Sequence, residues 1–242
     1  MQHLVRYSLA ATILAVGMVI SAALISRFFL RVHQEKEIRV KGFAEAPILS
    51  DGGKLRFSLS VRREAREEAY LTLTQQVGEI LGKVRETAPT DFEIREHNPD
   101  ISERYKLNDK GTKTHDVESY LASQTVTLSS SDVKWIKLTG TNLNKLIGQG
   151  FDIDVKAPSF LVSNLTDIKQ KLLERATADG YRRADMMARH SGARVGALRS
   201  ARQGVFQITQ PKSTRTSSYG IYDTSTIEKS IKAVVTLEYS VE

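Results

Sequence analysis

The stretch ATADGYRRADMMARHSGARVGAL, residues 176–198, decides how the fold is interpreted. Small side chains recur in it at every fourth position. This spacing places them on one face of a helix, where they let a neighbouring helix or sheet approach closely. The pattern starts near Ser163 and stops at Gly192, a typical helix C-cap. We therefore expect a long packing helix whose apolar stripe consists of Leu172, Ala176, Gly180, Ala184 and Ala188, extended by Leu165, Ile168 and Met187.

Charged residues occupy the flanks and the opposite side of the same helix. Asp179 precedes Arg183 by four residues, and Asp185 precedes Arg189 by four, which is the favourable order for ion pairs along a helix. Acids matched in this way neutralise much of the positive surface that a nucleic-acid backbone needs, so we expect no nucleic-acid binding. His190 lies near the helix C-terminus, where interaction with the helix dipole explains it better than catalysis does.

The remaining segments mix strand and helix patterns without a strict alternation. KLRFSLSV, residues 54–61, has the two-residue period of a half-buried strand, and residues 63–85 place apolar side chains at helical spacing. Asp132 stands where an N-cap belongs, before a helix at 133–148. This mixture favours an α+β fold, with amphipathic helices packed on antiparallel or mixed sheets. Further strands are expected at 37–46, 92–98, 119–132, 151–155, 159–163, 204–210 and 232–241, and polar loops at 108–116 and 210–226.

The composition limits the chemistry that the chain can perform. Hydrophobic residues make up 40% and charged residues 26%, which is typical of a globular protein. The sequence has no cysteine, which excludes disulfides, thiolate nucleophiles and cysteine-ligated metals. The formal net charge is +7, and Arg6, Arg27 and Arg31 account for three of these charges. The remaining excess is too small to indicate a nucleic-acid partner.

No pattern of catalytic or ligand-binding residues stands out. The sequence lacks a nucleophile elbow, a zinc-protease motif and a nucleotide-binding loop. Asp152 and Asp154 project to the same side of a strand, and solvated carboxylates explain them better than an acid/base pair does. We expect no catalytic, cofactor-binding or metal-binding residues, no cofactor and no enzymatic activity, with an uncharacterised hydrolase as the weakest hypothesis. The five histidines, which lack metal-ligand spacing, are His3, His33, His97, His115 and His190.

Residues 7–26 are twenty uncharged, mostly apolar residues between Arg6 and Arg27. As a helix they would extend about 30 Å, the thickness of the hydrocarbon core of a bilayer. A cleavable signal peptide is the alternative, because Ser21-Ala22-Ala23 resembles a cleavage site. The apolar part of a signal peptide is only about 7–15 residues long. The length therefore favours an uncleaved membrane anchor.

The order of segments resembles the SIMPL-domain family, whose bacterial members include periplasmic immunogenic proteins. A strand with the pattern I-x-V-x-G (Ile38, Val40, Gly42) precedes a second strand and an amphipathic helix. A phenylalanine strand, SFLVS, then precedes the alanine-spaced helix, a G-x-x-x-G turn (Gly192 and Gly196) and a final alternating strand.

The resemblance covers about residues 37–242 and departs from the family at two expected turns. Residues 50–53, Ser-Asp-Gly-Gly, stand where the family commonly has proline-aspartate. Lys229 and Ser230 stand where a glycine is usual. These departures concern the geometry of the loops more than the fold.

The resemblance implies an α+β domain exported to the cell envelope, without established catalytic residues. We accordingly expect a transmembrane signal anchor at 1–31, a short stalk at 32–37 and a SIMPL-like periplasmic domain at 38–242. Arg27, Arg31 and Lys36 outnumber the cations before the anchor and would by themselves retain the domain in the cytoplasm. Large domains are translocated despite a few flanking charges, so we expect residues 32–242 in the periplasm of a single-pass inner-membrane protein.

Some family members form large ring-like homo-oligomers, and bacterial members suggest a link to envelope or oxidative stress tolerance. We therefore expect a closed homo-oligomer, held in the bilayer by residues 7–26, with contacts through strand edges and the helix at 63–85. The alternative is a monomeric module that senses a ligand or a partner through the loop at 210–226, which contains Tyr219 and Tyr222.

Overall fold

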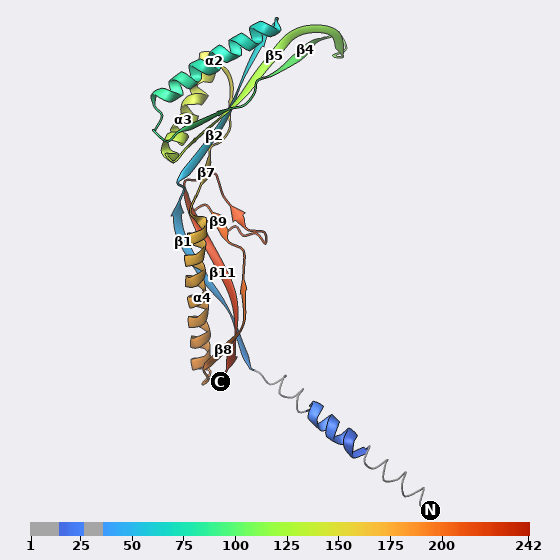
Figure 1. Cartoon of the computed structure of the whole chain (residues 1–242), viewed down its shortest axis with the longest axis vertical. Helices are drawn as coiled ribbons and strands as arrows, with labels where there is room; N and C mark the ends of the chain where they lie inside the picture. Colours follow the sequence, from blue (N-terminus) through green and yellow to red (C-terminus); the bar gives the residue numbers. More distant parts are fainter. Residues whose placement is uncertain (1–14, 27–35) are drawn as a thin grey trace, which may run out of the picture. The chain divides into compact units, whose positions relative to one another are not determined.

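The computed structural model describes residues 15–26 and 36–242. They divide into two compact units, each assembled from segments that are far apart in the sequence (Figure 1). Unit 1 comprises the described residues up to Ala44 together with 172–204 and 233–242. Unit 2 comprises residues 45–171 and 205–232. Both units receive residues from β1 (Glu37–Leu49), α4 (Leu165–His190) and β11 (Glu228–Val241).

The predicted membrane anchor at 7–26 lies only partly within the described residues. Residues 15–26 form a helix with exposed side chains, whereas residues 7–14 and most of the predicted stalk at 32–37 lie outside the described part. Within residues 15–26 and 36–242, no helix has both the length and the apolar character needed to cross a membrane. The anchor therefore stays a prediction.

The larger sheet of unit 2 is antiparallel and centres on two strands. β2 (Gly52–Arg63) pairs with β5 (Lys113–Ser130) from Gly53 opposite Ser130 to Arg63 opposite Tyr120. The other edge of β2 pairs with two short strands, and the other edge of β5 pairs with two more. These four strands are β6 (Asp152–Val155), β7 (Ser159–Leu161), β3 (Glu93–Glu96) and β4 (Asp100–Leu107).

One face of this sheet carries the hydrophobic core of unit 2. Leu55, Phe57 and Leu59 of β2 are fully buried at alternate positions, as the two-residue period predicts. Helices cover this face, and their inward side chains join the same cluster (Figure 1). They are α2 (Arg66–Glu86), α3 (Val133–Lys145) and the 3₁₀ turn η1 (Leu146–Gln149). The opposite face is polar, and Ser58 Oγ lies 2.9 Å from Thr125 Oγ1 there.

The second sheet is mixed, with the order β1-β11-β9-β10 and β8 also paired to β11. In unit 2, β9 (Gln207–Thr209) runs antiparallel to β11 and parallel to β10 (Ile221–Tyr222). In unit 1, β8 (Val195–Gln203) runs antiparallel to the second half of β11. The predicted α+β class with antiparallel and mixed sheets is confirmed.

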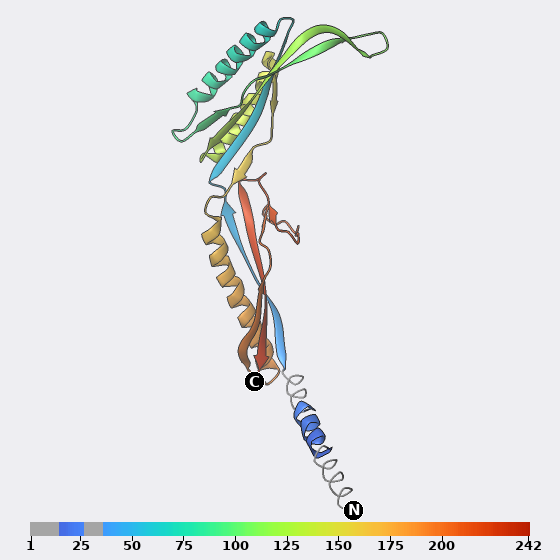
Figure 2. The same ribbon diagram turned by 45° about the vertical axis from the view of Figure 1, so that its right-hand side comes forward.

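Helix α4 packs in unit 1 on the small side chains that the sequence identifies. Its buried residues are Leu172, Ala176, Gly180, Ala184 and Ala188. A Cβ atom placed on Gly42 of β1 would lie 2.0 Å from the carbonyl oxygen of Ala176 and 2.7 Å from the amide nitrogen of Gly180. Only a hydrogen atom fits at that position, so α4 lies directly against β1 (Figure 2). Gly192 has a φ of +73°, which confirms it as the C-cap.

Three strands are absent from the sequence prediction, namely β4, β8 and the two-residue β10 inside the predicted loop at 210–226. Residues 100–107 form β4, and the predicted loop at 108–116 is shorter because β5 begins at Lys113. Gly196 lies inside β8 rather than in a turn. β4 and β8 are largely exposed and have no clear apolar alternation, so pairing with neighbouring strands, rather than their own sequence, makes them strands.

Other predictions place individual residues incorrectly. Lys229 and Ser230 lie within β11 and not in a turn before it. Met187 is 53% exposed rather than part of the packing stripe. The close approach of the Gly42 and Gly180 backbones keeps this stripe narrow, so Met187 falls at its edge.

Candidate functional sites

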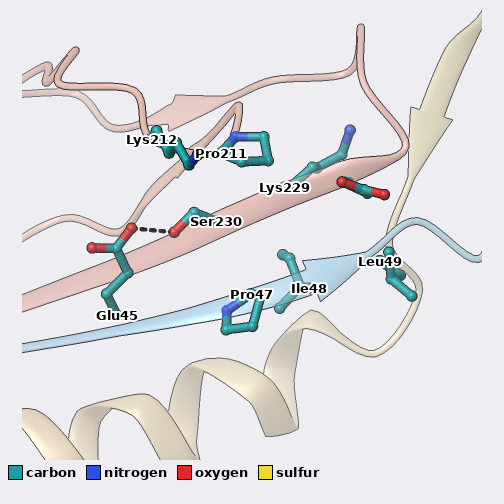
Figure 3. A pocket seen from close by; sticks show the side chains of 9 residues that line it. Glu45, Pro47, Ile48, Leu49, Pro211, Lys212, Lys229 and Ser230 are labelled. Atoms are coloured by element: carbon teal, nitrogen blue, oxygen red, sulfur yellow. Dashed lines mark hydrogen bonds between the residues drawn. The ribbon is translucent and has the colours of Figure 1, made fainter.

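A pocket of about 770 Å³ lies in unit 2 between β1, β11 and the start of the 210–226 loop. Figure 3 shows Pro47, Ile48 and Leu49 of β1 on one side, and Pro211 and Lys212 of the loop on the other. The wall from β1 is apolar, and the wall from the loop combines a proline ring with a lysine. Such a combination of apolar walls with a few polar groups is typical of small-molecule sites.

Two polar side chains that line this pocket, Glu45 and Ser230, are engaged with each other. Ser230 Oγ donates a hydrogen bond to Glu45, which is the contact drawn in Figure 3. Lys232 Nζ lies 3.6 Å from Glu45 Oε1 and donates to the carbonyl oxygen of Ser213 at 2.6 Å. Lys232 thus neutralises the carboxylate of Glu45, and its bond to Ser213 ties the loop to β11. The site is therefore better suited to binding than to proton transfer.

Lys229, which also lines the pocket, has a completely buried side chain. Its ammonium group donates to the carbonyl oxygen of Thr226 and lies 3.9 Å from Asp223 Oδ2. Burial lowers the pKa of Lys229, and the charge of Asp223 opposes this shift. Burial would raise the pKa of Asp223, but hydrogen bonds from Thr226 and Ser225 outweigh it and hold that pKa below 3.8. The lysine thus fastens the turn that precedes β11.

The two tyrosines proposed for recognition by the 210–226 loop have different environments. Tyr219 is 95% exposed and free to contact a partner. Tyr222 lies in β10, and its hydroxyl group accepts a hydrogen bond from the backbone N–H of Val162 at 3.1 Å. Tyr222 therefore holds the loop against β7, and Tyr219 is the better candidate for recognition.

The other candidates from the sequence do not come together in a site. Asp152 and Asp154 are exposed on β6, and Asp154 Oδ2 lies 2.5 Å from Lys156 Nζ, in agreement with solvated strand carboxylates. Among the described residues, no three histidines or carboxylates are placed to hold a metal ion. His3 and His33 lie outside these residues.

A second hollow, of about 780 Å³, lies in unit 1 between β1 and the charged side of α4. We call it the Arg–Met groove. Both predicted ion pairs of α4 are present, with Arg183 Nε 2.8 Å from Asp179 Oδ2 and Arg189 NH2 2.6 Å from Asp185 Oδ2. The groove is lined by Arg39, Val40, Lys41, Asp179, Arg182, Arg183, Met186 and Met187.

The distal part of the β4–β5 hairpin is a two-stranded ribbon, which we define as residues 104–119. Here β4 and β5 pair from Arg104 opposite Ser119 to Leu107 opposite Lys113. The pairing of β5 with β2 starts only at Tyr120, so within the described chain these ribbon strands pair only with each other. Figures 1 and 2 both show the hairpin continuing past the end of α2.

Comparison with known protein families identifies most of the chain. The model of the SIMPL family, described as a protein of unknown function (DUF541), matches residues 38–239. The search of curated proteins found no match.

Some solved structures share a limited similarity with the chain. An amidase of the hydantoinase/carbamoylase family from Burkholderia phymatum is 15% identical, with a TM-score of 0.30 over 62% of this chain and 37% of that one. The designed protein Foldit4 is 14% identical, with a TM-score of 0.24 over 45% of this chain and 96% of that one. This chain thus spans 37% of the amidase. Similarity at these TM-scores bears on neither the fold nor the activity of this chain.

Proposed function

This chain belongs to the SIMPL family, and we propose that it is a membrane-anchored envelope protein that acts by assembling with copies of itself. In this proposal the apolar residues 7–26 hold the chain in the bacterial inner membrane, and residues 32–242 lie in the periplasm. The copies form a closed homo-oligomer, and the protein contributes to envelope or oxidative stress tolerance. The structural support comes from unit 2.

The observation that carries the proposal is the ribbon at 104–119. Two-stranded hairpins without a third strand or a covering helix are at best marginally stable in water. The ribbon has two open edges, and it exposes Leu107 and Val117, which are 62% and 37% accessible. Open strand edges are normally covered, blunted or paired. A second copy of the chain would supply the missing strand.

The charges of the ribbon favour such a copy as its partner. Cations and anions are mixed along it, with four of the first and three of the second, so neither sign dominates. A surface of mixed sign is unsuited to nucleic acid or to an anionic membrane, whereas it can complement an identical surface across a symmetry axis. The cations are Arg104, Lys106, Lys110 and Lys113, and the anions are Asp109, Asp116 and Glu118.

A shortened hairpin tests this proposal. Replacing residues 105–118 by an Asn-Gly dipeptide would join Arg104 to Ser119, which face each other, through a tight two-residue turn. The core of unit 2 contains no residue of the removed segment, so the variant should keep its fold. We expect the full-length protein in mild detergent to form one discrete particle of high order, and the shortened variant to be monomeric.

Mass photometry or light scattering over a wide concentration range gives the readout, with circular dichroism as the control for folding. A uniform monomer population of the unmodified protein would refute assembly. An unchanged particle for the shortened variant would instead show that assembly uses another surface, such as α2. Survival of a deletion strain under oxidative stress, complemented with either form, tests whether assembly matters for tolerance.

The second candidate function is a monomeric binding module, and the 770 Å³ pocket favours it. The 210–226 loop supplies Pro211 and Lys212 to this pocket and exposes Tyr219 beyond it. In that case Tyr219→Ala or Pro211→Ala would abolish ligand or partner binding while the shortened hairpin would have no effect. The loop variants and the shortened hairpin therefore separate the two functions.

A further inference from the structure

The positive charge of the domain is concentrated in unit 1. The described residues of unit 1 include ten lysines and arginines against six acidic residues, a net charge of +4. Unit 2 has 22 basic and 21 acidic residues, although it is far larger. The first segment of unit 1 after the predicted anchor and stalk ends at Ala44. A basic segment next to a membrane span is attracted to anionic lipids.

Within unit 1, the Arg–Met groove contains cations that are incompletely neutralised. Arg39 Nε lies 2.6 Å from Glu238 Oε1, and Arg183 is paired with Asp179. Lys41 has no ion pair within the described chain, and Arg182 reaches Asp179 only at 3.8 Å. Arg183 forms the closer ion pair with Asp179. Arg182 and Lys41 can therefore bind an external anion. The pairs with Glu238 and Asp179 also hold the neighbouring arginines in place.

The same groove exposes flexible apolar side chains beside these cations. Met186 and Met187 are 59% and 53% accessible. Methionine thioethers adapt to irregular apolar surfaces, and arginine binds phosphate through several N–H groups. A free phosphate ion would use the cations alone. A phospholipid would use both, with its phosphate at Lys41 and Arg182 and its glycerol and acyl carbons on the methionines.

We propose that the Arg–Met groove binds the head group of an anionic phospholipid in the membrane that anchors the chain. This inference rests on the proposed anchor. Arg39 follows Ser26, the last residue of the apolar stretch, by thirteen positions, so a fully extended chain reaches about 45 Å at most. The groove is therefore tethered within that distance of the end of the apolar stretch, which raises the effective concentration of the head groups available to it.

The test measures lipid binding to the full-length protein in a neutral detergent by native mass spectrometry. The probes are dioctanoyl phosphatidylglycerol, its zwitterionic phosphatidylcholine counterpart and glycerol 3-phosphate. We expect binding of phosphatidylglycerol only. One basic residue near a lipid surface contributes about fivefold in affinity, so Lys41→Gln combined with Arg182→Gln should weaken binding about 25-fold.

Lys134→Gln combined with Lys137→Gln, which removes two exposed cations of α3 in unit 2, is the matched control and should leave binding unchanged. Equal binding of both lipids, or no loss in the groove variant, would overturn the proposal. Binding of glycerol 3-phosphate as tight as that of the lipid would assign the groove to a free phosphate instead. Lipid preference and the effect of the groove variant are both measured without reference to the anchor or to assembly. N-terminal sequencing tests the anchor, and particle mass tests assembly.

Discussion

At the scale of single residues, one close contact governs the packing of unit 1. The stripe of small residues in α4 follows from the sequence because its period is local. Gly42, which lies against the stripe, is separated from it by more than 130 residues, and only its place in the I-x-V-x-G pattern marks it. The pairing of Gly42 with Gly180 therefore required the structure, although both glycines stand out in the sequence.

Gly42→Ala should destabilise unit 1 strongly. The added methyl group would meet backbone atoms, which cannot rotate away as a side chain can. Overpacking costs about 1–3 kcal/mol, and we expect the upper end of this range. Arg183→Ala is the control on the same helix, because it removes an exposed ion pair that contributes about 0.3–0.5 kcal/mol. Equal shifts of the urea midpoint for the two variants would contradict this account of the contact.

Asp179 should make unit 1 sensitive to acid. The N–H of Phe43 donates to its carboxylate at 2.9 Å, and this hydrogen bond, followed by the one from Arg183, holds the pKa of Asp179 below 3.8. A carboxylate whose pKa is lower in the folded state stabilises the fold above its unfolded pKa, and this contribution disappears as the pH falls through the folded pKa. Urea midpoints measured from pH 6 down to pH 2 should decline less for Asp179→Asn than for the unmodified protein. Parallel declines would show that the hydrogen bond from Phe43 is not formed in solution.

At the scale of elements, the two helices on the larger sheet begin in different ways. Asp132 caps α3, because its side chain accepts hydrogen bonds from the N–H groups of Lys134 and Trp135 at 3.0 and 2.9 Å. The sequence predicts this cap correctly. Ala65 occupies the same position before α2 with extended backbone angles but offers no side-chain acceptor. The N–H groups in the first turn of α2 therefore lack the side-chain hydrogen bonds that Asp132 gives to α3.

Two substitutions test the difference between the N-caps of α2 and α3, and they should change the stability of unit 2 in opposite directions. Ala65→Ser should stabilise unit 2 by about 1 kcal/mol, because the serine completes a capping box with Glu68 three residues later. Asp132→Ala should destabilise it by about the same amount. Both effects are measured as shifts of the denaturant midpoint at constant slope. A destabilising Ala65→Ser would mean that the start of α2 is misplaced.

The sequence indicates strands most clearly where one face is buried. Residues 54–61 and 232–241 show the two-residue period because the core lies on one side of them. β4 and β8 lack that constraint, and pairing with β5 and β11 creates them. The ribbon, and with it the main support for assembly, was therefore outside the reach of the sequence. The sequence indicates the loop at 210–226 and a strand at 37–46, but it does not show that they meet at a pocket with Lys229.

At the scale of the whole molecule, the division into two units was not foreseen. The sequence suggests one domain over 38–242, since the strands and helices follow each other without a linker. Each unit combines segments from both ends of that range, so no boundary exists in the linear order. The uneven distribution of charge becomes visible only after the segments are grouped in space. This grouping assigns most of the excess positive charge of residues 36–242 to unit 1.

The side of the membrane on which the domain lies can be measured directly. The chain has no cysteine, so a single introduced thiol is the only site for a maleimide. Thr141→Cys places it on an exposed position of α3, and Gln2→Cys places it before the anchor. If residues 32–242 are periplasmic, a membrane-impermeant maleimide should label the first variant in intact cells and the second only after lysis. The flanking cations Arg27, Arg31 and Lys36 favour the reverse orientation, but long domains are translocated largely regardless of such charges. Labelling of Gln2→Cys alone in intact cells would place the domain in the cytoplasm, and the envelope function would then have to be abandoned.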